Sequence, residues 1–240
     1  IKTVSIKKLN PERTGFRNNQ FIRFAIMDFL DIKISAYAES HTEAEPELLQ
    51  QLNRETYAKV LMPRMLSGHM QGRILSMFSR MLRPQRILEI GTYTGYSALC
   101  LAEGLTDDGI LYTIDINDEL EPMSSKYFQS SPYANRIKAI TGVATEIIPT
   151  LNETLDLVFI DADKENYSSY FDMVWDMLRV GGVIIADNVL WSGHVIKDAT
   201  QMDYETAALH AFNEKVHADP RCKHVLMPVR DGLMVVMKTS

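Results

Sequence analysis

The feature that most constrains the fold is an alternation of short apolar runs with amphipathic stretches after Pro84. The runs are RILEI (86–90), ILYTID (110–115), RIKAI (136–140), LDLVFID (155–161) and GVIIAD (182–187). The stretches between them, near 95–104, 117–130, 143–151 and 166–179, have helical spacing. Strands that alternate with helices, without hairpin signals, predict a parallel sheet covered on both faces.

The two ends of the chain follow other patterns. Apolar residues recur at helical spacing from 43 to 82, with Pro63 between two helices. After a helix near 203–217, CKHVLMPV and GLMVVMK flank Arg230 and Asp231, which predicts an antiparallel hairpin at one edge of the sheet. We therefore expect one α/β domain over 1–240, with a helical segment (1–83) and a doubly wound core (84–240) of about seven strands.

Composition narrows the class of partner. A formal net charge of -6 and a pI near 5.5, without a long basic run, argue against nucleic acid or an anionic membrane surface. No apolar run approaches the roughly 18 residues of a membrane span, and the first residues lack the apolar region of a signal peptide. Cys100 and Cys222 stand in no metal-binding spacing. We expect a cytoplasmic protein that acts on a small molecule.

The end of the first strand carries a glycine loop, ILEIGTYTGYSALC. In an open parallel sheet, ligands bind beyond the carboxyl ends of the strands, and Gly91 and Gly95 would let a ligand approach the backbone. A dinucleotide fingerprint requires a third glycine where this chain has Tyr93, so a nucleoside without a pyrophosphate fits better. Taken alone, the loop is equally consistent with a tight strand-to-helix turn.

Asp115 ends the second strand, where a carboxylate can accept hydrogen bonds from both ribose hydroxyls of a nucleoside. The alternative is a solvated residue near a helix start, a common place for aspartate. Together with the glycine loop on the preceding strand, the ribose interpretation is favoured.

The fourth and fifth runs both end in aspartate, at Asp161 and Asp187, and Asn188 follows the second. Neighbouring strands lie about 4.8 Å apart, so these side chains should converge at one edge of the sheet. Two carboxylates and an amide favour Mg²⁺ or Ca²⁺ over zinc. Each aspartate could instead cap a helix. The six histidines form no pair at ligand spacing, which predicts surface or core roles for them.

Four motifs, ILEIGTYTGYSALCLA, FIDADKENY, ADNVLWSG and LMPVRDGLMVVMK, occur in the order and spacing of a known family. Together they resemble the cation-dependent O-methyltransferases related to caffeoyl-CoA and catechol O-methyltransferases, over roughly residues 39–238. The resemblance implies a Rossmann-like fold, S-adenosyl-L-methionine and a divalent cation as cofactors, and methylation of a vicinal-dihydroxy aromatic acceptor. It also implies a homodimer, with the front helices and the stretch 15–30 as candidate contacts.

The resemblance assigns roles by motif. Cofactor-binding residues would be Met65, Ser67, Glu89, Gly91, Tyr93, Ser97, Asp115, Ala144, Asp161 and Asp163, with Gln71 nearby at a position that is often acidic in the family. Metal ligands would be Asp161, Asp187 and Asn188, and catalytic residues Asp161 and Lys164. Lys164 would accept the hydroxyl proton or stabilise the oxyanion as an ammonium; as a residue type, it could equally be a solvated lysine at a helix start.

Two residues of the loop after the fifth strand, Trp191 and His194, could line an acceptor pocket, although Trp191 could equally be ordinary packing. Two other functions stay open on the sequence alone. One is a nicotinamide-dependent oxidoreductase, which Tyr93 and the paired oxygen ligands disfavour. The other is a noncatalytic nucleoside-binding protein with the same fold.

Overall fold

The structure, a computed structural model, describes residues 31–240. The stretch 15–30, which we expected to contribute to a dimer contact, lies outside the described residues. No helix among residues 31–240 is both long enough and apolar enough to span a bilayer.

Seven strands form a single sheet in the order β3-β2-β1-β4-β5-β7-β6. They are β1 (Arg86–Ile90), β2 (Ile110–Asp115), β3 (Ile137–Thr141), β4 (Leu155–Ile160), β5 (Leu178–Asp187), β6 (Cys222–Met227) and β7 (Leu233–Lys238). The first five are parallel, and β7 runs antiparallel to both β5 and β6. The predicted Rossmann-like, doubly wound sheet with an antiparallel C-terminal hairpin is confirmed.

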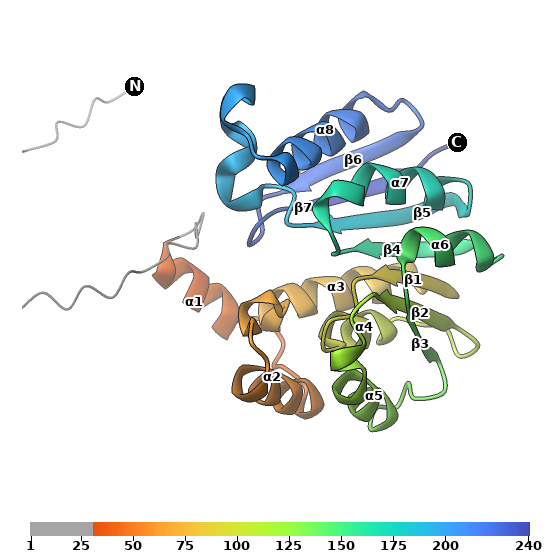
Figure 1. Cartoon of the computed structure of the whole chain (residues 1–240). Helices are drawn as coiled ribbons and strands as arrows, with labels where there is room; N and C mark the ends of the chain where they lie inside the picture. Colours follow the sequence, from red (N-terminus) through yellow and green to blue (C-terminus); the bar gives the residue numbers. More distant parts are fainter. Residues whose placement is uncertain (1–30) are drawn as a thin grey trace, which may run out of the picture.

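Helices precede the sheet and connect its strands (Figure 1). The α-helices are α1 (Ile32–Ser40), α2 (Glu47–Lys59), α3 (Gly68–Leu82), α4 (Tyr96–Ala102), α5 (Glu121–Gln129), α6 (Ala144–Ile147), α7 (Tyr167–Trp175) and α8 (Tyr204–Ala218). Short 3₁₀ turns lie at η1 (Pro63–Met65), η2 (Asp118–Leu120), η3 (Ile148–Thr150), η4 (Lys164–Asn166), η5 (Trp191–Ile196) and η6 (Ala199–Gln201).

Alternate strand residues pack against helices on opposite faces of the sheet, as period-two geometry requires. Leu88 and Ile90 of β1 face a buried cluster with Phe171 of α7 and Phe212 of α8. Ile87, the residue before Leu88, faces the other cluster, to which α2, α3, α4 and α5 contribute. Figure 1 shows the two layers, α6 to α8 on one side of the sheet and α2 to α5 on the other. The helical front is therefore part of the packing of one face.

Element boundaries differ from the prediction in two places. The helix expected over 166–179 ends at Trp175, and β5 begins at Leu178, four residues before the expected strand start at 182. Gly181, at φ 78°, interrupts the apolar pattern there, and the pairing of β5 with β4 is irregular between Leu155 and Leu157. In addition, α1 lies outside the predicted helices.

Candidate active site

The winding of the sheet reverses between β1 and β4, where ligands bind in folds of this type. The backbone N–H of Asp161, just after β4, donates to the carbonyl of Ile90 at 2.9 Å. Gly91 has φ 101°, and a Cβ added there would lie 2.0 Å from the Asp161 carbonyl oxygen. Only glycine fits this position, so the loop after β1 and the end of β4 lie in direct backbone contact.

Asp115 organises the loop after β1. Its Oδ2 accepts the backbone N–H groups of Thr92 at 2.9 Å and Tyr93 at 2.7 Å, and its Oδ1 accepts that of Asn117 at 2.9 Å. Tyr93 is in the left-handed region, at φ 49°. Asp115 is therefore not simply a solvated residue, since both of its carboxylate oxygens accept hydrogen bonds from backbone N–H groups near the end of β2.

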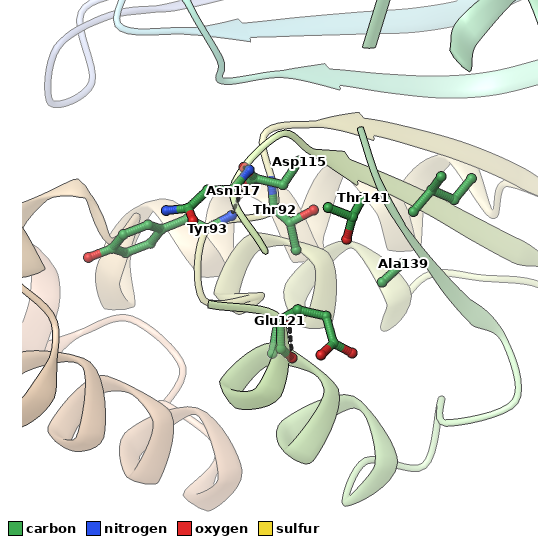
Figure 2. Close-up of a pocket in the computed structure, with 9 residues that line it drawn as sticks. Thr92, Tyr93, Asp115, Asn117, Glu121, Ala139 and Thr141 are labelled. Atoms are coloured by element: carbon green, nitrogen blue, oxygen red, sulfur yellow. Dashed lines mark hydrogen bonds between the residues drawn. The ribbon is translucent and has the colours of Figure 1, made fainter. Parts of the chain in front are cut away.

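A surface groove opens beside Asp115 (Figure 2). Its lining residues are Thr92, Tyr93, Asp115, Asn117, Glu121, Ser124, Ala139, Ile140 and Thr141. The groove runs across the ends of β2 and β3, where sequence reasoning placed a ribose. Tyr93 connects this groove to the helical front, because its hydroxyl donates to the Met62 carbonyl at 3.0 Å.

Glu89 is a fully buried carboxyl group at the end of β1. Its Oε2 accepts the hydroxyl of Thr113 at 2.5 Å, and that hydroxyl lies 2.5 Å from the hydroxyl of Thr92. Its Oε1 has no hydrogen-bond partner among the described residues. Burial raises the pKa of Glu89 to about 8. A buried acceptor of this kind suits a cationic donor from a ligand; sequence reasoning found Glu89 but missed the two threonines.

The predicted oxygen cluster forms at the ends of β4 and β5. The register pairs Ile160 with Ala186, which sets Asp161 and Asp187 side by side. Asp187 is 3% exposed, and burial together with the negative charge of Asp161 raises its pKa. Asn188 follows in the left-handed region, at φ 59°, which asparagine tolerates.

These residues fit a hard divalent cation. Two neighbouring carboxylates with an amide oxygen beside them are the donor set that Mg²⁺ or Ca²⁺ favours. No group of three or more His, Cys, Asp or Glu side chains in the part of the chain the structure describes is arranged to hold a metal ion. The candidate set therefore depends on the Asn188 amide as its third member.

Lys164 reaches into this cluster from η4 and is buried. Its Nζ donates to Asp161 Oδ1 at 3.2 Å, to Asn188 Oδ1 at 3.0 Å and to the Tyr167 hydroxyl at 2.7 Å. Three acceptors match the three donors of an ammonium group. Because Lys164 is buried, the alternative that it is a solvated lysine at a helix start is excluded.

Gln71 and Arg230 support Asp187 from outside the cluster. Arg230 donates to Gln71 Oε1 at 3.2 Å, and Gln71 Nε2 donates to Asp187 Oδ2 at 2.5 Å. The same Arg230 nitrogen donates to the carbonyls of Leu66 and Ser67. The C-terminal hairpin is therefore connected to the helical front through the candidate metal site, a contact that sequence spacing could not reveal.

Arg230→Met should lower the free energy of unfolding by about 1–3 kcal/mol, since buried acceptors lose a charged donor. Chemical denaturation at neutral pH measures the change. Arg64→Met is the matched control, because Arg64 is an exposed arginine in the same front segment. Equal loss of stability in both variants would contradict the role of Arg230.

The loop after β5 has an unusual backbone. Trp191 and Ser192 lie in the left-handed region, at φ 46° and 51°, close to Asn188. Asp231 holds this loop, because its backbone carbonyl accepts the N–H of Leu190 at 2.8 Å and its Oδ1 accepts that of Ser192 at 2.5 Å. Such conformations are frequent at functional sites and give no sequence signal.

Trp191 lies over Lys164, with 5.8 Å from Nζ to the ring centroid, and His194 is partly buried nearby in η5.

The other predicted site residues lie around the same edge, with different degrees of exposure. Met65 is 58% exposed at the end of η1, whereas Ser67, Ser97 and Ala144 are buried at the starts of α3, α4 and α6. Asp163 is exposed, and its oxygens accept the Tyr170 hydroxyl and the Asn166 amide at 2.5 Å each. Asp163 is therefore held by the η4–α7 segment.

Comparison with known proteins identifies the family of this chain. The model of the O-methyltransferase family matches residues 38–239. Caffeoyl-CoA O-methyltransferase 5 of Nicotiana tabacum is 34% identical over 207 residues, which cover 82% of this chain and 86% of the relative. Caffeoyl-CoA O-methyltransferase of Mesembryanthemum crystallinum is 33% identical, with 82% and 81% covered.

Solved structures give the same result. The methyltransferase PaMTH1 of Podospora anserina, solved with SAH bound, superposes with a TM-score of 0.79 at 30% identity, covering 87% of this chain and 94% of that one. The O-methyltransferase TomG of Streptomyces achromogenes, solved with SAM, gives 0.79 at 27% identity, with 87% and 96% covered. These relatives do not favour a nicotinamide-dependent oxidoreductase. The chain belongs to the O-methyltransferase family and uses S-adenosyl-L-methionine as its methyl donor.

Proposed function

We propose that this enzyme methylates one hydroxyl of a vicinal-dihydroxy aromatic small molecule, of catechol or caffeoyl type, with a divalent cation at Asp161, Asp187 and Asn188. The observation that carries the proposal is the pairing of two carboxylates on adjacent strands beside a buried lysine. The caffeoyl-CoA O-methyltransferases among the relatives support the acceptor class. We take the cation to be Mg²⁺ or Ca²⁺.

The residues around β1 and β2 would bind the methyl donor. Asp115 would accept hydrogen bonds from the ribose hydroxyls, since a carboxylate has lone pairs beyond those that the loop N–H groups occupy. Glu89 offers its unpartnered oxygen to the α-ammonium of the methionine portion. Gly91, Ser97 and Ala144 would leave room for the rest of the S-adenosylmethionine molecule. This arrangement orients the donor toward the end of β4.

The residues at the ends of β4 and β5 would position the acceptor. When bound, a divalent cation lowers the pKa of a coordinated hydroxyl, and S-adenosylmethionine supplies an electrophilic methyl group. Lys164, held by three acceptors, places a positive charge where the phenolate oxygen would lie. Trp191 offers an aromatic surface over the same point. Orientation and charge therefore account for most of the expected catalysis.

Methyl transfer from labelled S-adenosylmethionine to a panel of catechols and caffeoyl thioesters tests the proposal. Each acceptor is assayed with Mg²⁺, with Ca²⁺ and with EDTA. Transfer to vicinal diols that stops in EDTA, with no transfer to the matched monohydroxy compounds, is the expected result. Equal transfer to monohydroxy acceptors in EDTA would refute both the cation and the acceptor class.

The raised pKa of Glu89 leads us to expect that binding of the methyl donor depends on pH. Because the pKa of Glu89 is raised, its carboxyl group is protonated at neutral pH in the protein without ligand. The free energy of unfolding therefore falls as the pH rises from about 4.5 to about 8. Pairing with an ammonium requires the ionised form, so S-adenosylhomocysteine should bind about tenfold more tightly near pH 8 than near pH 6.5. Calorimetric titration across this range measures the slope.

Glu89→Gln should bind S-adenosylhomocysteine weakly and lose this slope. Glu119→Gln, at an exposed position just after β2, should keep it. A slope that survives in Glu89→Gln would assign the pH dependence to another group.

We also propose that the enzyme is a homodimer. The helix α1 buries none of its residues and exposes Ile32, Ile34 and Tyr37, at 71%, 56% and 65%. Apolar side chains gathered on one exposed element are typical of contact surfaces. Light scattering after size exclusion measures the mass directly, and a monomer at micromolar concentration would contradict the proposal.

A further inference from the structure

Two histidines that are apart in the sequence come together away from the candidate active site. His217 lies in the last turn of α8, and His224 lies in the edge strand β6. His217 Nδ1 is 3.2 Å from His224 Nε2, and the ring planes are nearly perpendicular, at 88°. The spacing of the histidines along the sequence gives no sign of this pair, because it is the turn between α8 and β6 that folds the chain back and brings the two rings together.

This separation suits a shared metal ion as well as a direct hydrogen bond. Imidazole nitrogens bind Zn²⁺ at about 2.0–2.1 Å in tetrahedral geometry, which places two such nitrogens about 3.3 Å apart. A hydrogen bond between two neutral rings uses one donor and one acceptor, and both are replaced when the ring nitrogens turn toward a common cation.

A cavity of about 310 Å³ adjoins the pair and provides room for further ligands. Its lining residues are Asn213, Glu214, His217, His224, Val225, Leu226 and Met234. Glu214 lies one helical turn before His217 but does not complete a three-residue ligand group with the two histidines, so water molecules would supply the other ligands. The Oδ1 of Asn213 is buried and has no hydrogen-bond partner among the described residues. Water molecules bound to a cation are donors that such an oxygen can accept.

We propose that His217 and His224 form a binding site for a transition-metal ion of the zinc type, separate from the oxygen cluster at Asp161 and Asp187. Imidazole ligands select zinc, nickel or copper over Mg²⁺ and Ca²⁺, whereas the all-oxygen cluster has the opposite preference. The two sites therefore discriminate between classes of cation. This inference does not depend on which phenol the enzyme methylates.

The histidine site is connected to the candidate active site through α8. Asn213, one turn before His217, donates its side-chain amide to the carbonyl of Val189 at 2.8 Å. Val189 is the residue after Asn188, a proposed ligand of the oxygen cluster. A metal that fixes the end of α8 against β6 would thus also restrain the start of the loop that carries Trp191.

Calorimetric titration of metal-stripped protein with Zn²⁺, in millimolar Mg²⁺ to saturate the oxygen cluster, tests the proposal. Cobalt absorption reports the ligands independently of activity. We expect one zinc ion per chain, and a loss of affinity of about tenfold or more in His217→Ala, in His224→Ala and in the double variant. His210→Ala, an exposed histidine of the same helix, is the matched control and should bind as the unaltered chain does.

Unchanged zinc affinity in the double variant would overturn the proposal. So would zinc binding that is lost only in Asp187→Ala, since the ion would then occupy the oxygen cluster. Thermal unfolding of each variant confirms that the protein tested is folded, and the exposed position of His217 makes its replacement the safer of the two.

Discussion

Asp187→Ala is expected to lower kcat for methyl transfer by about 10³-fold or more. Removal of one of two carboxylates from a hard-cation site weakens both cation binding and the charge stabilisation that the cation gives, which together amount to several kcal/mol. The substitution also removes the acceptor of the Gln71 amide. Initial rates across a series of Mg²⁺ concentrations separate the two effects, since weaker cation binding is partly restored at high concentration.

The matched control is Asp198→Ala, an exposed aspartate in the segment that follows the same strand, which should retain full activity. S-Adenosylhomocysteine binding should be nearly unchanged in Asp187→Ala, because the groove beside Asp115 lies at the other strand ends. Full methyl transfer by Asp187→Ala in EDTA would refute a cation at this position.

Lys164→Met should reduce kcat by about 10²-fold or more, with little change in S-adenosylmethionine affinity. The three hydrogen bonds of Lys164 fit an ammonium group, so we expect electrostatic stabilisation of the phenolate oxygen. Steady-state kinetics with saturating donor measures the change in kcat. Lys197→Met, at an exposed lysine of the following loop, is the control.

The pH profile of kcat distinguishes the two possible roles of Lys164. An ammonium that remains charged leaves the shape of the profile the same in the unaltered enzyme and in Lys164→Met. A general base would instead produce a rise with pH in the unaltered enzyme that the variant lacks. The second outcome would assign proton transfer to Lys164.

The sequence predicts the central part of the sheet well because each strand there is short, apolar and bounded by charges or glycine. The convergence of Asp161 and Asp187 follows from one simple rule, that strands separated by a single crossover helix are usually neighbours. The register of β4 and β5 bears this out. Gly91 is likewise readable, since a glycine after a buried strand signals a close backbone approach.

Other features depend on contacts that local patterns do not encode. The start of β5 at Leu178 depends on pairing with Leu155 and on the positive φ of Gly181. Asp187, the partner of Gln71, comes from a distant segment, and His217 meets His224 only because the turn between α8 and β6 reverses the chain. Tertiary context overrides local propensity at each of these points.

The connection from Arg230 to Gln71 joins residues that are 159 positions apart in the chain. A chain made from its N-terminus would complete the strands that hold the methyl donor well before the residue that secures Asp187 emerges from the ribosome. Because closing so long a loop is slow, the donor pocket should form early during synthesis, and the catalytic edge should be completed only after Arg230 has been added. Premature termination would then yield a chain that can hold the methyl donor but lacks the support for the groups that use it.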